Sequence, residues 1–79
     1  MPSINEVMKS RRTRKGMSQT QVADKLKVSS QTISNFERGA SGLPLKTILR
    51  LCKIYDLPRV TARKILVEDY ANKVAAVIK

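Results

Sequence analysis

Residues 19–38 read QTQVADKLKVSSQTISNFER, a pattern that predicts two short helices joined by a tight turn. At 3.6 residues per turn, Ile33 and Phe36 fall on one side of the second helix. The polar side chains fall on the other side and form a stripe of Ser30, Gln31, Ser34, Asn35 and Arg38. Amide side chains can read adenine, arginine can read guanine, and hydroxyls can contact either base in the major groove of DNA. This stripe therefore suits a helix that lies in the major groove.

Capping signals bracket the two helices of this stretch. Ser18 followed by Gln21 is a capping box, so a helix over about 19–26 is predicted. Ser29 is the expected N-cap of the next helix, and Gly39 is expected to end it. The same logic applies upstream, where a capping box of Ser3 and Glu6 predicts a first helix from about Ile4 to Gly16.

Apolar periodicity continues beyond Gly39. A fourth helix over about 45–55 is predicted from the i, i+3, i+4, i+7 spacing of Leu45, Ile48, Leu49 and Cys52, and it ends at Leu57-Pro58. A long fifth helix follows, starting either at Pro58 or with Thr61 as its cap, because neither Gly nor Pro interrupts the remaining residues. The predicted fold class is therefore all-α, a compact bundle of about five helices.

The fifth helix carries a seam of apolar residues spaced three and four apart: Val67, Tyr70, Val74 and Val77. Such spacing suits packing against a partner helix, which would make the seam a dimerisation element. The alternative is that the seam folds back on its own domain. The expected division is a DNA-binding unit over 1–57 and a C-terminal helix over 58–79.

Composition narrows the class of function. The 79 residues form one small domain with a net charge of +10, from 16 Lys and Arg against 6 Asp and Glu. Such a charge suits nucleic acid or an anionic membrane. The single cysteine, Cys52, and the absence of a signal-peptide pattern suggest a reducing cytoplasm. No apolar run is long enough to span a bilayer, and the chain contains no histidine.

The region from about Val7 to Leu57 resembles the Cro and phage-repressor type of helix-turn-helix, the XRE family. The resemblance rests on a gap-free set of residues: Arg12, Gly16, Met17, Ser18, Gln19, Val22, Ala23, Leu26, Val28, Ser29, Ile33, Glu37, Arg38, Gly39, Leu45 and the block 48–51. It implies a lambda-repressor-like bundle whose third helix enters the major groove. It also implies a regulator, commonly a repressor, that binds a two-fold operator as a homodimer. One departure is Lys27, which stands where the family often has a turn glycine.

Site roles follow from the residues and the resemblance together. Base contacts are expected from Gln31 and Asn35, with Ser30 and Ser34 beside them on the same stripe. Gln19 at a helix N-terminus is expected to hold a phosphate, and Arg38 is expected to contact phosphate rather than guanine. Further phosphate candidates are Thr32, Ser41, Lys46 and Thr47. In the resembling family the positions of Arg12 and Glu37 often pair, which implies a partly buried salt bridge.

Other functions fit the sequence less well. A protein-binding module, such as an antitoxin that grips a partner through its last helix, is the alternative to a DNA-binding regulator. An enzyme is not expected, because the sequence offers no nucleophile–base pair, metal cluster or phosphate-binding glycine loop. Membrane binding is not expected either, because the basic residues are spread over several faces. No cofactor or metal is expected.

Overall fold

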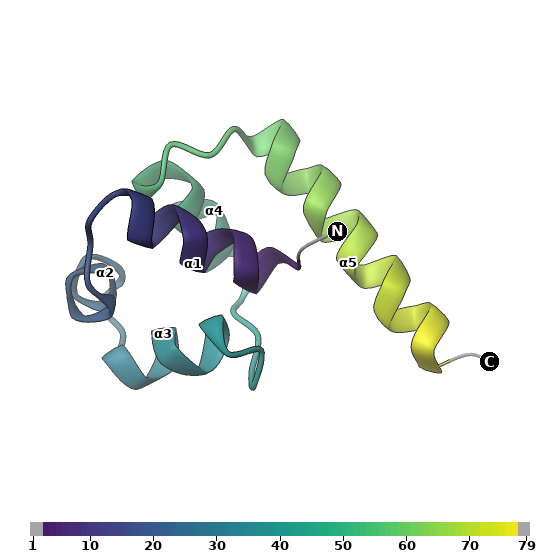
Figure 1. Ribbon diagram of the computed structural model, residues 1–79, viewed down its shortest axis with the longest axis horizontal. Coiled ribbons are helices and arrows are strands. Elements are labelled where there is room, and N and C mark those ends of the chain that lie inside the picture. The colour runs from purple at the N-terminus through teal and green to yellow at the C-terminus, as the bar shows by residue number, and fades with distance from the viewer. Residues whose placement is uncertain (1–2, 78–79) are drawn as a thin grey trace.

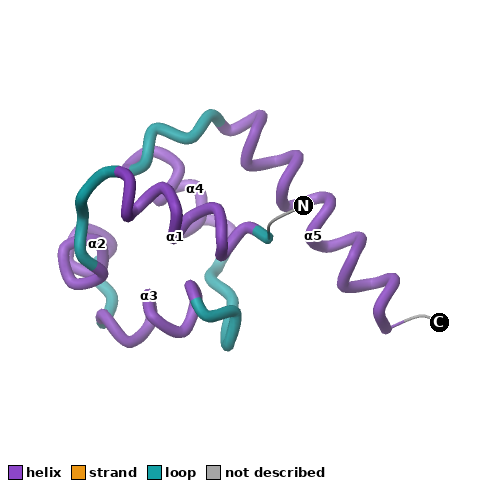
Figure 2. Tube along the Cα trace, viewed as in Figure 1, coloured by secondary structure: helices purple, strands orange, loops and turns teal. Residues whose placement is uncertain are grey.

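The computed structural model describes residues 3–77, which form five helices and no strand (Figures 1 and 2). The helices are α1 (Ile4–Arg14), α2 (Gln19–Leu26), α3 (Ser30–Glu37), α4 (Leu45–Ile54) and α5 (Arg59–Val77). The predicted all-α class is confirmed. Helices α1 to α4 pack around one another, whereas the C-terminal half of α5 extends away from them (Figure 1). None of the helices in residues 3–77 is long and apolar enough to cross a membrane.

Helix α1 begins at Ile4, as predicted, but the predicted capping box is wrong. The Ser3 side chain accepts no backbone N–H, and its hydroxyl instead faces two side-chain acceptors, the amide oxygen of Asn5 and the Glu6 carboxylate at 3.0 Å. The hydroxyl is therefore turned toward the neighbouring side chains and away from the free N–H groups at the helix end. At the other end Gly16 takes a φ of +70°, the left-handed conformation that stops a helix with little steric strain.

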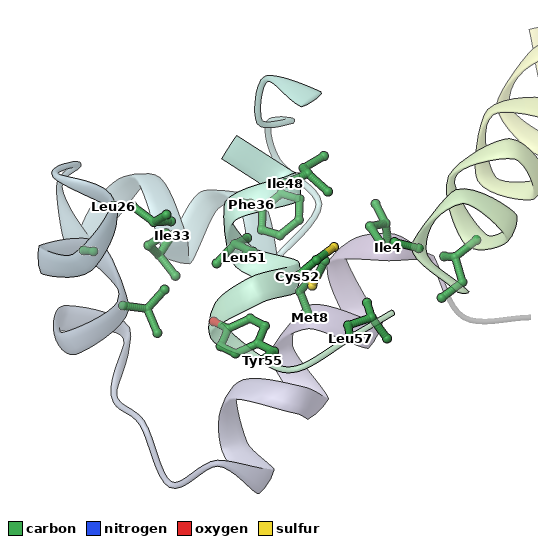
Figure 3. Packing of buried hydrophobic residues seen from close by; sticks show 14 residues of the cluster. Ile4, Met8, Leu26, Ile33, Phe36, Ile48, Leu51, Cys52, Tyr55 and Leu57 are labelled. Atoms are coloured by element: carbon green, nitrogen blue, oxygen red, sulfur yellow. The ribbon is translucent and has the colours of Figure 1, made fainter. Parts of the chain in front are cut away.

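The core lies where α1 to α4 and the start of α5 meet (Figure 3). Its largest fully buried side chains include Tyr55, Met8, Ile33 and Leu51. Cys52 is also buried, as expected of a small core hydrophobe, and burial raises the pKa of its thiol. A chain of this length buries a small core, so each of these side chains carries a large share of the stability.

Helix α4 buries only part of the predicted stripe, because Ile48 and Cys52 are buried as predicted whereas Leu49 is half-buried and Leu45 is exposed. Leu45 is 61% exposed, and the buried residues are Ile48, Leu51, Cys52 and the following Tyr55. Both stripes satisfy helical periodicity, because Leu49 and Leu51 are both apolar. Packing against the other helices selects the second stripe and leaves the first turn of α4 outside the core.

Helix α5 begins at Arg59, and the Pro58 carbonyl accepts a backbone hydrogen bond from Ala62 over 3.0 Å. The start at Pro58, rather than a cap at Thr61, is therefore the alternative that the structure adopts. Ala62 and Ile65 belong to the core cluster. The predicted division between 57 and 58 thus separates two segments that share a core, and only the later part of α5 leaves the bundle.

Candidate nucleic-acid interface

The turn between α2 and α3 fixes how these two helices are placed. Lys27 adopts left-handed angles of φ 57° and ψ 44°, where glycine would be the least strained residue. Its N–H bonds to the Asp24 carbonyl over 3.3 Å, and the Val28 N–H bonds to the Ala23 carbonyl over 3.0 Å. This is the Schellman pattern of a helix end. The turn is therefore built as predicted despite the lysine.

Capping boxes and caps set the starts of both helices. The Ser18 side chain accepts from the Gln21 N–H over 3.0 Å, and the Gln21 side chain accepts from the Ser18 N–H over 2.8 Å, so this predicted capping box is confirmed. The Ser29 side chain accepts from the Thr32 N–H over 3.2 Å, which confirms Ser29 as the N-cap of α3.

Helix α3 has two chemically opposite sides. Ile33, Phe36 and Glu37 are buried against the bundle. The polar stripe predicted from the sequence lies on the outer side, with Ser30, Gln31 and Arg38 exposed and Ser34 and Asn35 half-buried. The stripe is therefore open to solvent along the whole helix and accessible to a large ligand.

Side chains within this stripe are hydrogen-bonded to one another. Gln31 donates from Nε2 to Asn35 Oδ1 over 3.0 Å. Arg38 donates from its guanidinium to the same Asn35 oxygen. Their spacings of four and three residues place them on neighbouring turns of one helix face. All three residues were singled out from the sequence, but the hydrogen bonds between them were not predicted, although their spacing places them within reach of one another.

A buried ion pair holds α3 against α1. Arg12 donates from Nε to Glu37 Oε2 over 2.7 Å and from its terminal nitrogen to Oε1 over 3.1 Å. The two side chains are only 14% and 3% exposed. The salt bridge expected between Arg12 and Glu37 is therefore formed. Arg12 also donates to the Met17 carbonyl over 2.8 Å, which anchors the ion pair to the loop before α2.

Gln19 joins the same network. Its amide donates from Nε2 to Glu37 Oε1 over 2.9 Å, and its side chain is half-buried. This contact ties the first residue of α2 to the last residue of α3. The contact was not anticipated from the sequence, which indicated Gln19 only as a phosphate contact. An amide held in this way keeps its carbonyl oxygen and one N–H for another partner.

The surroundings of the ion pair are poorly solvated. Burial, and after it the nearby negative charge of Glu37, raise the pKa of Tyr55 to about 12 against the opposing effect of Arg12. The hydrogen bond with Glu37 raises the pKa of Arg12, against a smaller opposing effect of burial. The Arg12 guanidinium therefore stays charged, and the ion pair lies in a low-dielectric setting.

The remaining phosphate candidates lie in three places. Thr32 is half-buried and its hydroxyl lies 2.9 Å from that of Ser29, so it belongs to the cap of α3. Ser41 is exposed in the loop after α3, and its N–H bonds to the Asn35 carbonyl over 3.3 Å. Lys46 is exposed and Thr47 half-buried in the first turn of α4. Gln19, Arg38 and Ser41 are thus brought near the C-terminal end of α3, whereas Lys46 and Thr47 stand on the next helix.

Arg50 makes a long-range contact that was not predicted from the sequence. It donates to the carbonyls of Lys25 over 3.1 Å and Leu26 over 3.5 Å. These carbonyls lie at the C-terminal end of α2, where unpaired acceptors and the negative end of the helix dipole favour a cation. Arg50 therefore helps α4 to hold the end of α2 beside the turn.

Comparison with known proteins gives one match. A family model described as helix-turn-helix matches residues 8–60, which is more than half of the chain. No curated protein and no solved structure matches the chain.

Proposed function

Because the chain belongs to the helix-turn-helix family of Cro and phage-repressor type, a family of DNA-binding regulators, we propose that it is a sequence-specific repressor. It binds a two-fold operator as a homodimer, with α3 in the major groove of each half-site. The observation that carries this proposal is the polar stripe of α3, which is open to solvent while the opposite side of the same helix is buried.

Base contacts come from Gln31 and Asn35, with Ser30 and Ser34 permitting close approach or bonding through water. These residues occupy the N-terminal part and the middle of α3, which commonly supply base contacts in this motif. Glu37 points to the other side, where the ion pair with Arg12 fixes the angle of the helix. The buried network thus supports the orientation of the side chains that face the bases.

Phosphate contacts surround this surface. Gln19 retains one N–H and its carbonyl oxygen beyond its bond to Glu37, and it lies at a helix N-terminus. Arg38, Lys46 and Ser41 are exposed, and Thr32 and Thr47 add hydroxyls near helix starts. Such contacts orient the protein on the duplex, and the excess of positive charge supplies the affinity.

Gln31→Ala is expected to weaken binding to the preferred site by about 1–3 kcal/mol while affinity for random duplex changes little. The reason is that a base contact contributes only where the right base is present. The preferred site would first be selected from random duplexes, and both affinities measured at one fixed salt concentration. Lys46→Ala is the matched control, because loss of a phosphate contact weakens both kinds of DNA alike. Equal losses of affinity for the preferred site and for random duplex in Gln31→Ala would show that Gln31 does not read a base.

Dimerisation is assigned to the outward face of α5. Val67, Tyr70 and Val77 are 61%, 72% and 84% exposed, and Val74 is half-buried. Apolar surface left in water is unfavourable by about 25 cal/mol per Å². Pairing of two α5 helices would cover this face and give the two-fold symmetry that a two-fold operator requires.

A chain cut after Glu68 is expected to stay folded but to sediment as a monomer. The cut keeps Ala62 and Ile65 in the core and removes Tyr70, Val74 and Val77. Affinity for the two-fold site should then fall by about 100-fold or more, because the two half-sites are no longer bound by linked domains. Sedimentation, thermal melting and operator binding would be measured on the same preparation.

The double variant Tyr70→Ser, Val77→Ser is the matched control for this cut, because it keeps the chain length and changes only exposed positions. It is expected to weaken the dimer as well. A shortened chain that remains dimeric would place the interface elsewhere. A full chain that sediments as a monomer would instead favour a different protein partner for this face, as in an antitoxin.

A further inference from the structure

Hydrogen bonds among Gln31, Asn35 and Arg38 on the outer side of α3 restrict which donors and acceptors each amide can present to DNA. Asn35 Oδ1 accepts from the guanidinium of Arg38 and from Gln31 Nε2, the latter over 3.0 Å. A carbonyl oxygen has two lone pairs, so both are engaged. No hydrogen bond within residues 3–77 uses the amide nitrogen of Asn35, which keeps two N–H groups free to donate.

Arginine determines the orientation of the two amides. A guanidinium carries five N–H donors and no acceptor, so Asn35 can meet Arg38 only through its oxygen. Gln31 reaches that same oxygen and must therefore use its own amide nitrogen. The carbonyl oxygen of Gln31 is then left free to accept. The direction of both amides is thus fixed by the charge of Arg38 and does not depend on which way an isolated amide would turn.

Arg38 can keep this role when DNA is bound. Asn35 is half-buried on α3, and a hydrogen bond to a charged donor is stronger than one between neutral groups. Arg38 uses one part of its guanidinium for Asn35, and its remaining N–H groups can still contact a phosphate. The phosphate contact assigned to Arg38 and its hold on Asn35 are therefore compatible.

We propose that Arg38 sets the base preference of Asn35, which then reads guanine and leaves the reading of an amino base to Gln31. Guanine presents two adjacent acceptors in the major groove, N7 and O6, to which the free N–H groups of Asn35 can donate. Adenine presents N7 as its only acceptor, beside N6–H₂, and Asn35 has no lone pair left to accept from that group. An amide side chain by itself suggests adenine, but the hydrogen bonds from Arg38 and Gln31 change the base preference of Asn35. This inference rests on the proposed function.

The test locates the base pair that Asn35 reads and then asks which base is preferred there. Sites are selected from random duplexes with the natural chain and with Asn35→Ala, and the position at which preference relaxes is the one Asn35 reads. We expect a G·C pair at this position, preferred about 5- to 100-fold over an A·T pair in either orientation.

Two variants then test the cause of the preference. Arg38→Ala should reduce the preference for G·C over A·T at this position by about 5- to 100-fold, because Asn35 regains its acceptor. Asn35→Asp should also abolish the preference for guanine, since an aspartate can still accept from Arg38 and Gln31 but cannot donate. Lys46→Ala is the control, because it should lower affinity for every site and leave this preference unchanged.

Selection of an A·T pair, in either orientation, at the Asn35 position overturns the inference while leaving DNA binding intact. So does an Arg38→Ala variant that loses affinity evenly, as Lys46→Ala does, with the base preference preserved. A natural chain that selects no sequence at all overturns the proposed function itself, and the inference with it. Circular dichroism of each variant confirms folding, which is expected for Arg38→Ala because this side chain is exposed.

Discussion

Affinity for duplex DNA is expected to fall by about 10³–10⁵-fold between 50 and 200 mM salt if a dimer makes about 6–10 phosphate contacts. The net charge of +10 on each chain and the exposed Arg38 and Lys46 support contacts of this number. The physical cause is release of counterions condensed on the DNA when cationic side chains neutralise phosphates. Fluorescence anisotropy of a labelled duplex over a salt series at constant pH gives the slope.

Charge-removing variants calibrate that slope. Each phosphate contact adds about 0.9 to the slope of log affinity against log salt, so Lys46→Ala in a dimer should lower it by about 1.8. Gln31→Ala carries no charge change and should leave the slope as it is. A flat salt response of the natural chain would contradict electrostatic binding and leave the basic composition without a role in affinity.

Arg12→Ala is expected to lower the free energy of unfolding by about 3–5 kcal/mol, because it strands the buried carboxylate of Glu37. The Glu37 side chain is 3% exposed, and without Arg12 only Gln19, among residues 3–77, still donates to its carboxylate. Small domains are stable by about 5–15 kcal/mol in total, so the melting temperature should drop sharply or folding should be lost. Thermal and urea unfolding followed by circular dichroism measure the change.

The ion pair between Lys15 and Asp56 offers a matched control. Those side chains are 39% and 76% exposed, and exposed pairs contribute little to stability. Lys15→Ala should therefore leave the melting temperature almost unchanged. Adding Glu37→Gln to Arg12→Ala should restore part of the lost stability, because the buried group is then neutral. Equal melting of Arg12→Ala and Lys15→Ala would show that the Arg12–Glu37 pair does not stabilise the fold.

Features governed by neighbouring residues could be predicted from the sequence. The capping box of Ser18 and Gln21, the N-cap Ser29 and the glycine stop at Gly16 each depend on a few adjacent positions. The helices, the tight turn at Lys27 and the polar stripe of α3 follow from these signals and from helical periodicity. The family and the outward polar side of α3 were accessible from the sequence for the same reason.

Contacts between distant residues were decided by the tertiary structure. Periodicity allowed two apolar stripes on α4, and only packing excluded Leu45 and buried Leu51. Likewise, Gln19 reaches Glu37 and Arg50 reaches the end of α2 because the helices cross at particular places, which local patterns do not encode. A sequence pattern fixes which side of a helix is apolar, but the position of its neighbours determines which residues on that side are covered.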